Sequence, residues 1–364
     1  MHPSCFSCEM PGLTESGIRR TVWPREDRVT ARVCAWTGRT TGLEAKDGPL
    51  IIDRSHILVL NYNGQDLLAE CLPSIVQAAR LAPVPCRVTV VDNGSAADPT
   101  GLIAAIDPEI GLIRHSNRGL ASFNDVLAGL DEPVVLLLNN DVKLAHDAVG
   151  PLLETFRNHP DALFSAPQCW TFDGSAYEGM RTRVRFNRGL VQGMSRVPGV
   201  MRLVDRPDLT AAAGPVLAVN RRRFLELGGY DPVFFPGRIE DLDLGFRGWM
   251  AGFRGYYVPE SLAYHKGFAT FEATFGASGC DVLAIRNTLI FMWKNTSGRR
   301  LRSHLGWLPA RLVYSLARGR TEFARGLLGA VSRLGGVMAG RRALAVGQEG
   351  WLERQEDYYK RFTW

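Results

Sequence analysis

Residues 134–142, VVLLLNNDV, are five apolar residues followed by two asparagines, an aspartate and a valine. An apolar run of this kind is typical of a strand in the centre of a buried sheet. An unpaired buried carboxylate is costly, so Asp141 must reach water, accept hydrogen bonds or meet a cation. The stretch therefore predicts a central strand with chemically demanding groups at its carboxyl end.

Three earlier apolar runs end in the same way: HILVLNYNG (56–64), RVTVVDNGS (87–95) and GLIRHSNRG (111–119). Helical patterns lie between these runs, over 66–81, 98–106, 119–130 and 145–158. This alternation predicts a doubly wound α/β domain with a mostly parallel sheet flanked by helices. Ligands bind at the carboxyl ends of the strands in such sheets. The polar residues expected there are Asn61, Asn63, Asp92, Asn93, Asn117, Asn139, Asn140 and Asp141.

Asp141 is the first candidate for chemistry. No G-x-G-x-x-G or P-loop motif follows any of the strands, so phosphates would have to be bound in another way. A carboxylate with neighbouring amide oxygens suits Mg²⁺ or Mn²⁺, which bind diphosphates while keeping several waters. Two plainer interpretations stay open: Asp141 could cap the helix expected near 145, and the Asp92–Ser95 segment could be only a turn.

The second half of the chain holds a denser acidic motif. Residues 221–227 predict a helix closed by Gly228, and Glu240-Asp241-Leu-Asp243 then opens another. Acids stabilise a helix start, and Asp243 could pair with Arg247 four residues on, but three acids in four residues exceed what a cap requires. His265 ends the strand-like stretch 256–267, where it is either structural or part of the same cleft.

Assembled, these motifs resemble family 2 glycosyltransferases of the GT-A fold, in the branch that includes bacterial rhamnosyltransferases. The resemblance covers about residues 56–295, and it ends with a helix that begins Arg286-Asn287. It implies an inverting enzyme that moves a sugar from a nucleotide-diphosphate sugar donor to an acceptor hydroxyl.

The resemblance also implies roles for individual residues. Asp241, beside Glu240, matches the catalytic base of the family. Asp141 matches the last acid of the D-x-D metal motif. His265 matches a histidine that binds the metal in some members. The donor-binding residues implied are Asn61, Asn63, Asp92, Asn117 and Gly119, with Asn139 and Asn140 beside the metal motif. Two positions depart from the family pattern: Asn139 replaces the first D-x-D acid, which lowers the negative charge at the Mg²⁺ or Mn²⁺, and Asp125 stands where the family often has asparagine. A base bound to metal would be too weak, so Asp241 is expected clear of the ion.

The basic charge of the chain is concentrated near its C-terminus. The 364 residues carry a net charge of +6, but residues 299–342 contain ten arginines and one acid, which is +9 and leaves −3 elsewhere. Leu305, Leu308, Leu312, Val313 and Leu316 form an apolar stripe, while Arg311, Arg318 and Arg325 recur every seven residues. Residues 303–342 therefore resemble a helix lying on an anionic membrane surface, with Trp307 at the interface. Packing on its own domain is the alternative, and four glycines argue against a nucleic-acid-binding helix.

Composition and cysteine usage limit the setting. Seven scattered cysteines favour a reducing, cytoplasmic location, at the inner face of the membrane if the basic region binds it. Cys5 and Cys8 form a lone C-x-x-C in a weakly ordered extension, and no apolar run is long enough for a membrane span or a signal peptide. We therefore expect an extension over 1–54, a GT-A domain over 55–295 and a basic helical region over 296–364.

The sequence predicts a metal-dependent glycosyltransferase that builds a surface polysaccharide or a lipid-linked glycan. The alternative is a catalytically silent nucleotide-sugar-binding protein of a glycan assembly complex. A nucleotidyltransferase is disfavoured, because the turn after the first strand lacks a glycine-rich loop with a basic residue.

Overall fold

A computed structural model describes residues 50–267 and 269–364. The expected extension over residues 1–54 and its C-x-x-C motif lie almost wholly outside the described residues. No helix in the described part of the chain is both long enough and apolar enough to cross a membrane.

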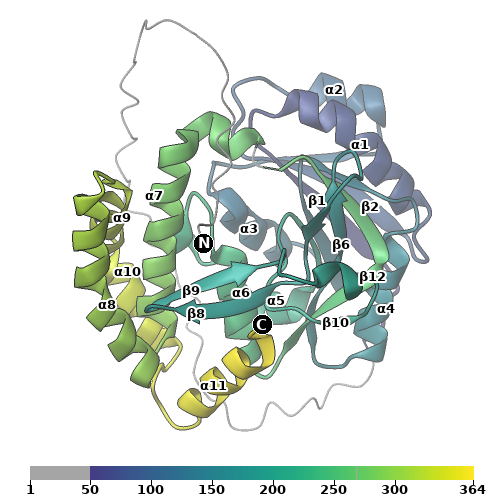
Figure 1. Cartoon of the computed structure of the whole chain (residues 1–364). Coiled ribbons are helices and arrows are strands. Elements are labelled where there is room, and N and C mark those ends of the chain that lie inside the picture. The colour runs from purple at the N-terminus through teal and green to yellow at the C-terminus, as the bar shows by residue number, and fades with distance from the viewer. Residues whose placement is uncertain (1–49, 268) are drawn as a thin grey trace, which may run out of the picture. The chain divides into compact units, whose positions relative to one another are not determined.

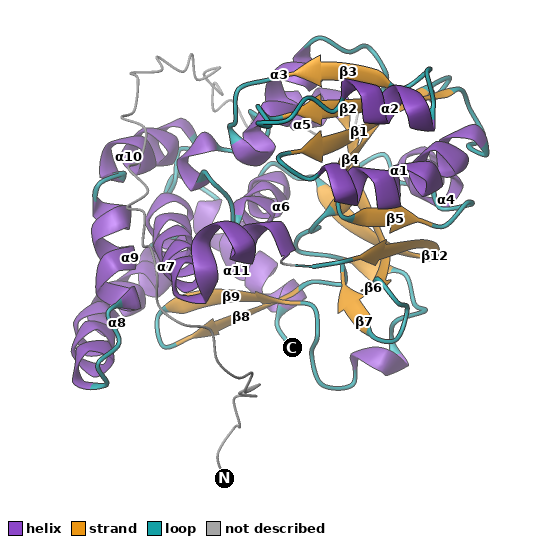
Figure 2. Ribbon diagram, turned by 90° about the horizontal axis from the view of Figure 1, so that it is seen from above, coloured by secondary structure: helices purple, strands orange, loops and turns teal. Residues whose placement is uncertain are grey.

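The core is a ten-stranded, mostly parallel sheet (Figures 1 and 2). Its main path runs in the order β10-β12-β6-β11-β4-β1-β2-β3, with β5 paired to β12 and β7 to β6. These strands are β1 (Ser55–Asn61), β2 (Cys86–Asp92), β3 (Gly111–Arg114), β4 (Val134–Asn139), β5 (Val142–Leu144), β6 (Ala162–Thr171), β7 (Tyr177–Gly179), β10 (Asp208–Leu209), β11 (Val216–Asn220) and β12 (Arg254–His265). The predicted α/β class is confirmed, because parallel strands covered on both faces need continuous apolar runs such as that of β4.

The register of the central strands brings the predicted polar residues to one edge. Asn61 lies opposite Asp92 in the β1–β2 pair, and Leu60 lies opposite Asn139 in the β1–β4 pair. The strand predicted from the apolar part of residues 134–142 is present as β4, which stops at Asn139; the chain then turns through Asn140 and Asp141, and β5 begins at Val142. The polar end of the VVLLLNNDV stretch is thus a turn at the carboxyl edge of the sheet.

Helices cover both faces of this sheet (Figure 2). The helices predicted from periodicity are present with shifted ends: α1 (Gln65–Arg80), α2 (Thr100–Ile106), the short η1 (Gly119–Ala121) with α3 (Ser122–Ala128), α4 (Val149–Asn158) and α5 (Arg221–Glu226). Because α4 starts at Val149 with Ala148 before it, the interpretation of Asp141 as a helix cap is wrong. Gly228, after α5, has the predicted left-handed backbone, with φ 78°.

A second hydrophobic core joins the acidic-motif helix to the C-terminal part of the chain. Its buried residues come from α6 (Glu240–Met250), α7 (Ala269–Asn295), α9 (Glu322–Val331), α10 (Leu334–Ala343), α11 (Trp351–Phe362) and the hairpin of β8 (Arg183–Asn187) with β9 (Leu190–Met194). Phe246 of α6, for example, packs edge-on against Phe291 of α7 and Tyr358 of α11. The remaining short elements are η2 (Val200–Arg202) and η3 (Pro232–Phe234). The C-terminal helices therefore help to hold α6 in place.

The basic region is not the single helix that its arginine spacing predicts. Helix α8 (Gly298–Ala317) ends before Arg318, and Arg325 belongs to α9. One side of α8 packs on the β8–β9 hairpin, where His304 is buried and meets the carbonyl of Gly189 through Nδ1 at 2.7 Å. The other side remains exposed. Packing on its own domain, the alternative for this region, is thus confirmed for one face of α8.

Candidate functional site

The carboxyl edge of β1, β2 and β4 is a connected row of polar side chains. Asn140 donates from Nδ2 to Asn61 Oδ1 (2.8 Å), and Asn61 donates from Nδ2 to Asp92 Oδ1 (2.9 Å). The Ser95 backbone N–H and hydroxyl both donate to Asp92, so the turn interpretation of residues 92–95 also holds. Asn63, with φ 50°, accepts a hydrogen bond from the Ala96 N–H. These contacts fix three strand ends relative to one another.

The loop that follows β3, the neighbour of β2, also reaches this edge. Asn117 Oδ1 accepts from the N–H of Gly119, and Asn93 donates to the Gly119 carbonyl. Gly119 has φ 59°, and a Cβ there would lie 2.8 Å from the carbonyl oxygen of Pro236. Only glycine fits this close approach. The Asn117–Gly119 loop is thereby placed against the segment that leads into α6.

Asp141 and His265 lie together at the ends of β4 and β12. The backbone N–H of Lys266 donates to the Asp141 carbonyl, and His265 pairs with Val142 in the β12–β5 ladder. His265 Nε2 is 3.3 Å from Asp141 Oδ2, and His265 Nδ1 is 3.0 Å from Glu178 Oε1. The sequence did not single out Glu178, because β7 brings it to His265 from a distant part of the chain.

These side chains suit a divalent cation. Asp141 is nearly buried, and its Oδ1 has no hydrogen-bond partner among the described residues. Burial disfavours the imidazolium form of His265, but hydrogen bonds and charges from Asp141 and Glu178 outweigh it and raise its pKa to about 9. The described residues contain no group of three or more His, Cys, Asp or Glu arranged around one metal position. Carboxylate and imidazole groups are common ligands of divalent cations, so Asp141 and His265 are the residues that could hold one.

Glu240 and Asp241 begin α6, directly after Arg238 and Ile239, which both have positive φ. Burial raises the pKa of both acids, and the Asp241 charge raises that of Glu240 further. Asp241 Oδ1 accepts a hydrogen bond from the Leu242 N–H, while Glu240 Oε2 is buried without a partner among the described residues. A carboxylate with a raised pKa at a helix start is suited to accept a proton near neutral pH.

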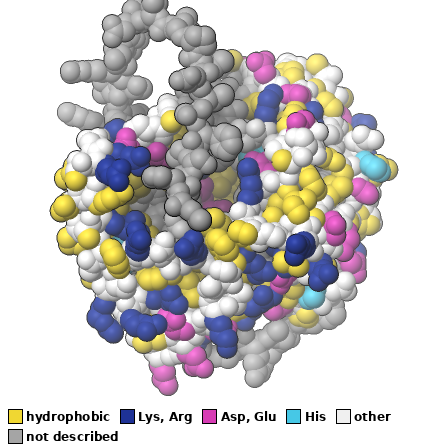
Figure 3. Space-filling view, in the orientation of Figure 1, with side chains coloured by type: hydrophobic (Ala, Val, Ile, Leu, Met, Phe, Trp, Pro, Cys, Tyr) yellow, Lys and Arg dark blue, Asp and Glu magenta, His cyan; other side chains and the backbone are white. Residues whose placement is uncertain are grey.

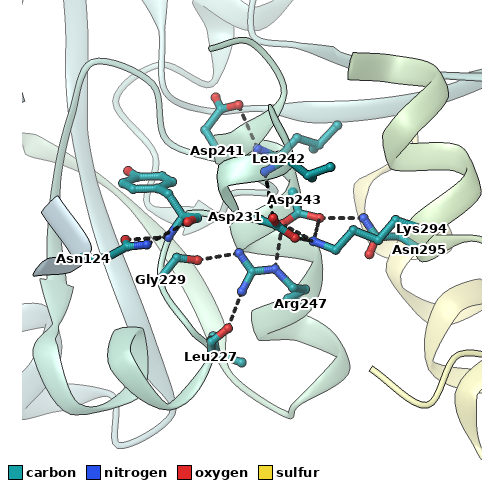
Figure 4. Close-up of polar contacts among 12 residues, drawn as sticks. Asn124, Leu227, Gly229, Asp231, Asp241, Leu242, Asp243, Arg247, Lys294 and Asn295 are labelled. Carbon is teal, nitrogen blue, oxygen red and sulfur yellow. Dashed lines mark hydrogen bonds and ion pairs between the residues drawn. The ribbon is translucent and has the colours of Figure 1, made fainter. Parts of the chain in front are cut away.

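Behind these acids lies a buried ionic cluster (Figure 4). Asp243 accepts from Arg247 Nε (2.6 Å), from Lys294 Nζ (2.9 Å) and from Asn295 Nδ2 (2.7 Å), and Lys294 also meets Asp231 at 2.6 Å. Burial opposes the ionisation of Asp243, but the Lys294 and Arg247 charges overcome it and hold its pKa below the usual value. The i, i+4 pair of Asp243 with Arg247 is as the sequence predicts.

Further polar contacts hold the loop before α6. Asn287 Nδ2 donates to the carbonyls of Phe234 and Gly237 at 2.7 Å, and Arg286 donates to that of Phe235. Asn124 of α3 binds both backbone groups of Tyr230, through Oδ1 to its N–H and through Nδ2 to its carbonyl. The Arg286-Asn287 motif therefore holds this loop through its backbone carbonyls.

Comparison with known sequences identifies the domain. Residues 56–228 match the family described as glycosyl transferase family 2. Residues 56–228 form a family 2 glycosyltransferase domain. The match ends before Glu240, Asp241 and His265, so their assignment depends on the geometry above.

The chain also resembles individual proteins. N-acetylglucosaminyl-diphospho-decaprenol L-rhamnosyltransferase of Mycobacterium tuberculosis is 27% identical over 291 residues, which covers 71% of this chain and 88% of that protein. Among solved structures, a mannosyltransferase from Pyrobaculum calidifontis in complex with GDP-Man and Mn²⁺ is 16% identical with a TM-score of 0.47, over 90% of this chain and 92% of that one. GalNAc-T7 with UDP, GalNAc and Mn²⁺ is 19% identical with a TM-score of 0.49, over 66% of this chain; the match spans about half of that protein, 48%.

The predicted site residues fall into three groups. The strand-end row holds Asn61, Asn63, Asp92 and Asn140, with Asn139 as the last residue of β4. Asp141 and His265 meet as predicted, and the Asn117–Gly119 loop contacts the segment before Glu240 and Asp241. Asp125, the departure noted in the sequence, meets His115 at 3.0 Å and also pairs with Arg118. Residues that sequence reasoning missed are Glu178, Asn124 and Asp231, whose roles come from contacts between distant segments.

Replacing Lys294 by methionine should destabilise the folded chain strongly. The change leaves Asp231 and Asp243 without their shared cation, and breaking a buried pair typically costs about 3–5 kcal/mol. Chemical unfolding of the full chain measures the loss. Arg54→Met is the matched control, because its ion pair with Asp131 is exposed and should matter little. Equal stability of the two variants would contradict a structural role for Lys294.

Proposed function

We propose that this chain is a metal-dependent, inverting glycosyltransferase that moves a sugar from a nucleotide-diphosphate sugar to an acceptor hydroxyl. The observation that carries the proposal is the pairing of two acidic sites around one edge: Asp141 with His265 at the strand ends, and Asp241 at the start of α6. The loop that carries Gly119 lies next to the second site, because Arg118 and Glu240 line the same small cavity. One site is built for a cation and the other for a proton.

The chain's own residues divide the reaction between them. Asp241 accepts the proton of the acceptor hydroxyl while that oxygen bonds to the anomeric carbon and the bond from this carbon to the diphosphate breaks. Asp141 and His265 would hold Mg²⁺ or Mn²⁺, which neutralises the departing diphosphate. The strand-end row of Asn61, Asp92 and Asn140 would orient the nucleoside. Attack from the side of Asp241, opposite the diphosphate, inverts the anomeric centre.

A lipid-linked acceptor in cell-envelope glycan synthesis, with rhamnose as a candidate sugar, is the next part of the proposal. The M. tuberculosis relative is named for an acceptor of this kind, a diphospho-decaprenol carrying N-acetylglucosamine. Such an acceptor lies at a membrane, so the enzyme would work at the inner, cytoplasmic face.

The exposed face of the C-terminal helices supports docking on an anionic lipid surface. Large apolar side chains on α8, α9 and α10 are 40–70% exposed: Leu305, Trp307, Val313, Tyr314, Leu316, Leu328, Val331, Leu334 and Met338. Arginines exposed among them are Arg302, Arg318, Arg320 and Arg325. Figure 3 shows hydrophobic and basic side chains intermixed on the side where these helices lie. Apolar side chains ringed by arginine bind anionic lipid better than neutral lipid.

Asp241→Asn should abolish sugar transfer without abolishing donor binding. The amide cannot accept the acceptor proton, so turnover with Mn²⁺ should fall by about 10²–10⁴-fold, while the thermal shift caused by the nucleotide sugar stays. Glu260→Gln, which changes an exposed acid on β12, is the control. Wild-type turnover in Asp241→Asn would refute the base assignment. Nucleotide-sugar binding by the wild type with no turnover for any donor would instead favour a catalytically silent protein.

The pH profile of kcat/KM should show an acidic limb above the ordinary carboxyl value of about 4. The base works as a carboxylate, and its pKa is raised by burial. Activity should therefore be lost as the pH falls through this raised value. The profile is measured at two saturating Mn²⁺ concentrations, because a limb caused by metal loss would move between them. A limb near 4 at both concentrations would contradict the assignment.

Exchanging Leu305, Val313 and Leu316 for glutamine should weaken binding to vesicles that contain phosphatidylglycerol. All three side chains are exposed on α8, so the charge and the fold stay the same. Truncation at Asn295 is a poorer test, since it removes core residues such as Trp351 and Tyr358. Flotation measures binding, with Leu81→Gln and Leu352→Gln, also exposed, as controls. Unchanged flotation would exclude this face as the membrane contact.

A further inference from the structure

His265 lies between two carboxylates, and each has a buried oxygen that lacks a partner. Asp141 Oδ2 is 3.3 Å from Nε2 of the ring, and Glu178 Oε1 is 3.0 Å from Nδ1. Asp141 Oδ1 and Glu178 Oε2 are both buried with no hydrogen-bond partner among the described residues. The proposed mechanism uses Asp141 and His265 but gives Glu178 no role.

The sheet fixes Glu178 where it is. In β7, Tyr177 and Gly179 pair with Trp170 and Cys169 of β6. The same strand β6 pairs its Thr171 with His265 of β12. Glu178 therefore reaches His265 across one intervening strand, from a position that two backbone ladders define.

The backbone around the histidine leaves room for this contact. Gly267, two residues after His265, has φ 65°, and a Cβ there would lie 2.9 Å from Glu178 Oε1. A larger residue would crowd the carboxylate that faces the ring. The side chains of His265 and Glu178 are 13% and 15% exposed, so water competes weakly for the contact.

We propose that Glu178 is a positioning residue for the cation site. Its carboxylate accepts the proton of His265 Nδ1, which turns the lone pair of Nε2 toward Asp141, where a divalent cation would be held. Histidine ligands are commonly oriented by a carboxylate on their second nitrogen, which also makes the ligand more basic. This inference rests on the metal dependence in the proposed function.

Glu178 would also supply the charge that the metal motif lacks. Asn139 replaces an acid there, so Asp141 is the motif's one negative charge. Glu178 adds a second one through the imidazole and not as a direct ligand, because it and Asp141 contact opposite nitrogens of the same ring. The finding that no three such side chains surround one metal position in the described residues agrees with this division.

Binding of Mn²⁺ to the full-length chain tests the role of Glu178. Free Mn²⁺ is measured by electron paramagnetic resonance, with Mn²⁺ alone and with Mn²⁺ plus UDP, GDP or dTDP. Glu178→Ala should raise the Kd for Mn²⁺ by about 10–100-fold. The Kd of Glu178→Gln should lie between those of the wild type and Glu178→Ala, because its amide oxygen still accepts from Nδ1 but carries no charge. Asp173→Ala, in the turn between β6 and β7, is the control that disturbs the hairpin without touching His265.

The outcomes separate this inference from the function on which it rests. If the wild type binds Mn²⁺ and Asp141→Asn weakens it while Glu178→Ala does not, the role of Glu178 is refuted and the metal-dependent function stands. If the wild type binds no Mn²⁺ with any nucleotide, both are refuted. A Glu178→Ala protein that binds weakly must show the wild-type melting temperature without metal. If melting falls in parallel and Glu178→Gln is equally weak, the effect is structural and the proposal fails.

Discussion

The carboxylate of Asp243 is the point on which the second half of the structure depends. Because this carboxylate is fully buried, its charge needs partners of opposite charge. It pairs with Arg247 of its own helix and with Lys294 of α7. Arg247 in turn donates to the carbonyls of Leu227 and Gly229, which tie α6 to the end of α5. Such a cluster adds little net stability over an apolar core, but removing one member leaves another buried charge without its partner, which is costly. Because Asp243 belongs to α6, this cluster also fixes the position of Glu240 and Asp241 at the start of the helix.

The first half obeys a different constraint. Parallel strands buried on both faces must align their hydrogen bonds, and here the alignment sets Asn61 level with Asp92. The side chains then satisfy each other along the edge, which is why polar groups are tolerated next to so apolar a sheet. The loop of Gly119 links the two halves, since its backbone approaches Pro236 too closely for any side chain.

Much of this arrangement could be predicted from sequence. The α/β class, the helices between the strands and the polar strand ends follow from apolar runs and their spacing, and the structure confirms them. The single helix expected over 303–342 was wrong. Local periodicity does not report that α8 ends at Ala317 and that Gly319, with φ 68°, follows it.

The sequence by itself named the residues that we propose to do chemistry: Asp141, Asp241 and His265 were singled out by their residue types and by the resemblance of their surroundings to family motifs. Only the tertiary structure decided what surrounds them. Glu178 reaches His265 through two strand pairings, and Lys294 reaches Asp243 across 51 positions of the chain. Contacts of this kind leave no periodic signal, because they depend on which strands pair and which helices pack. Those choices are made by burial of the whole core and not by any short segment.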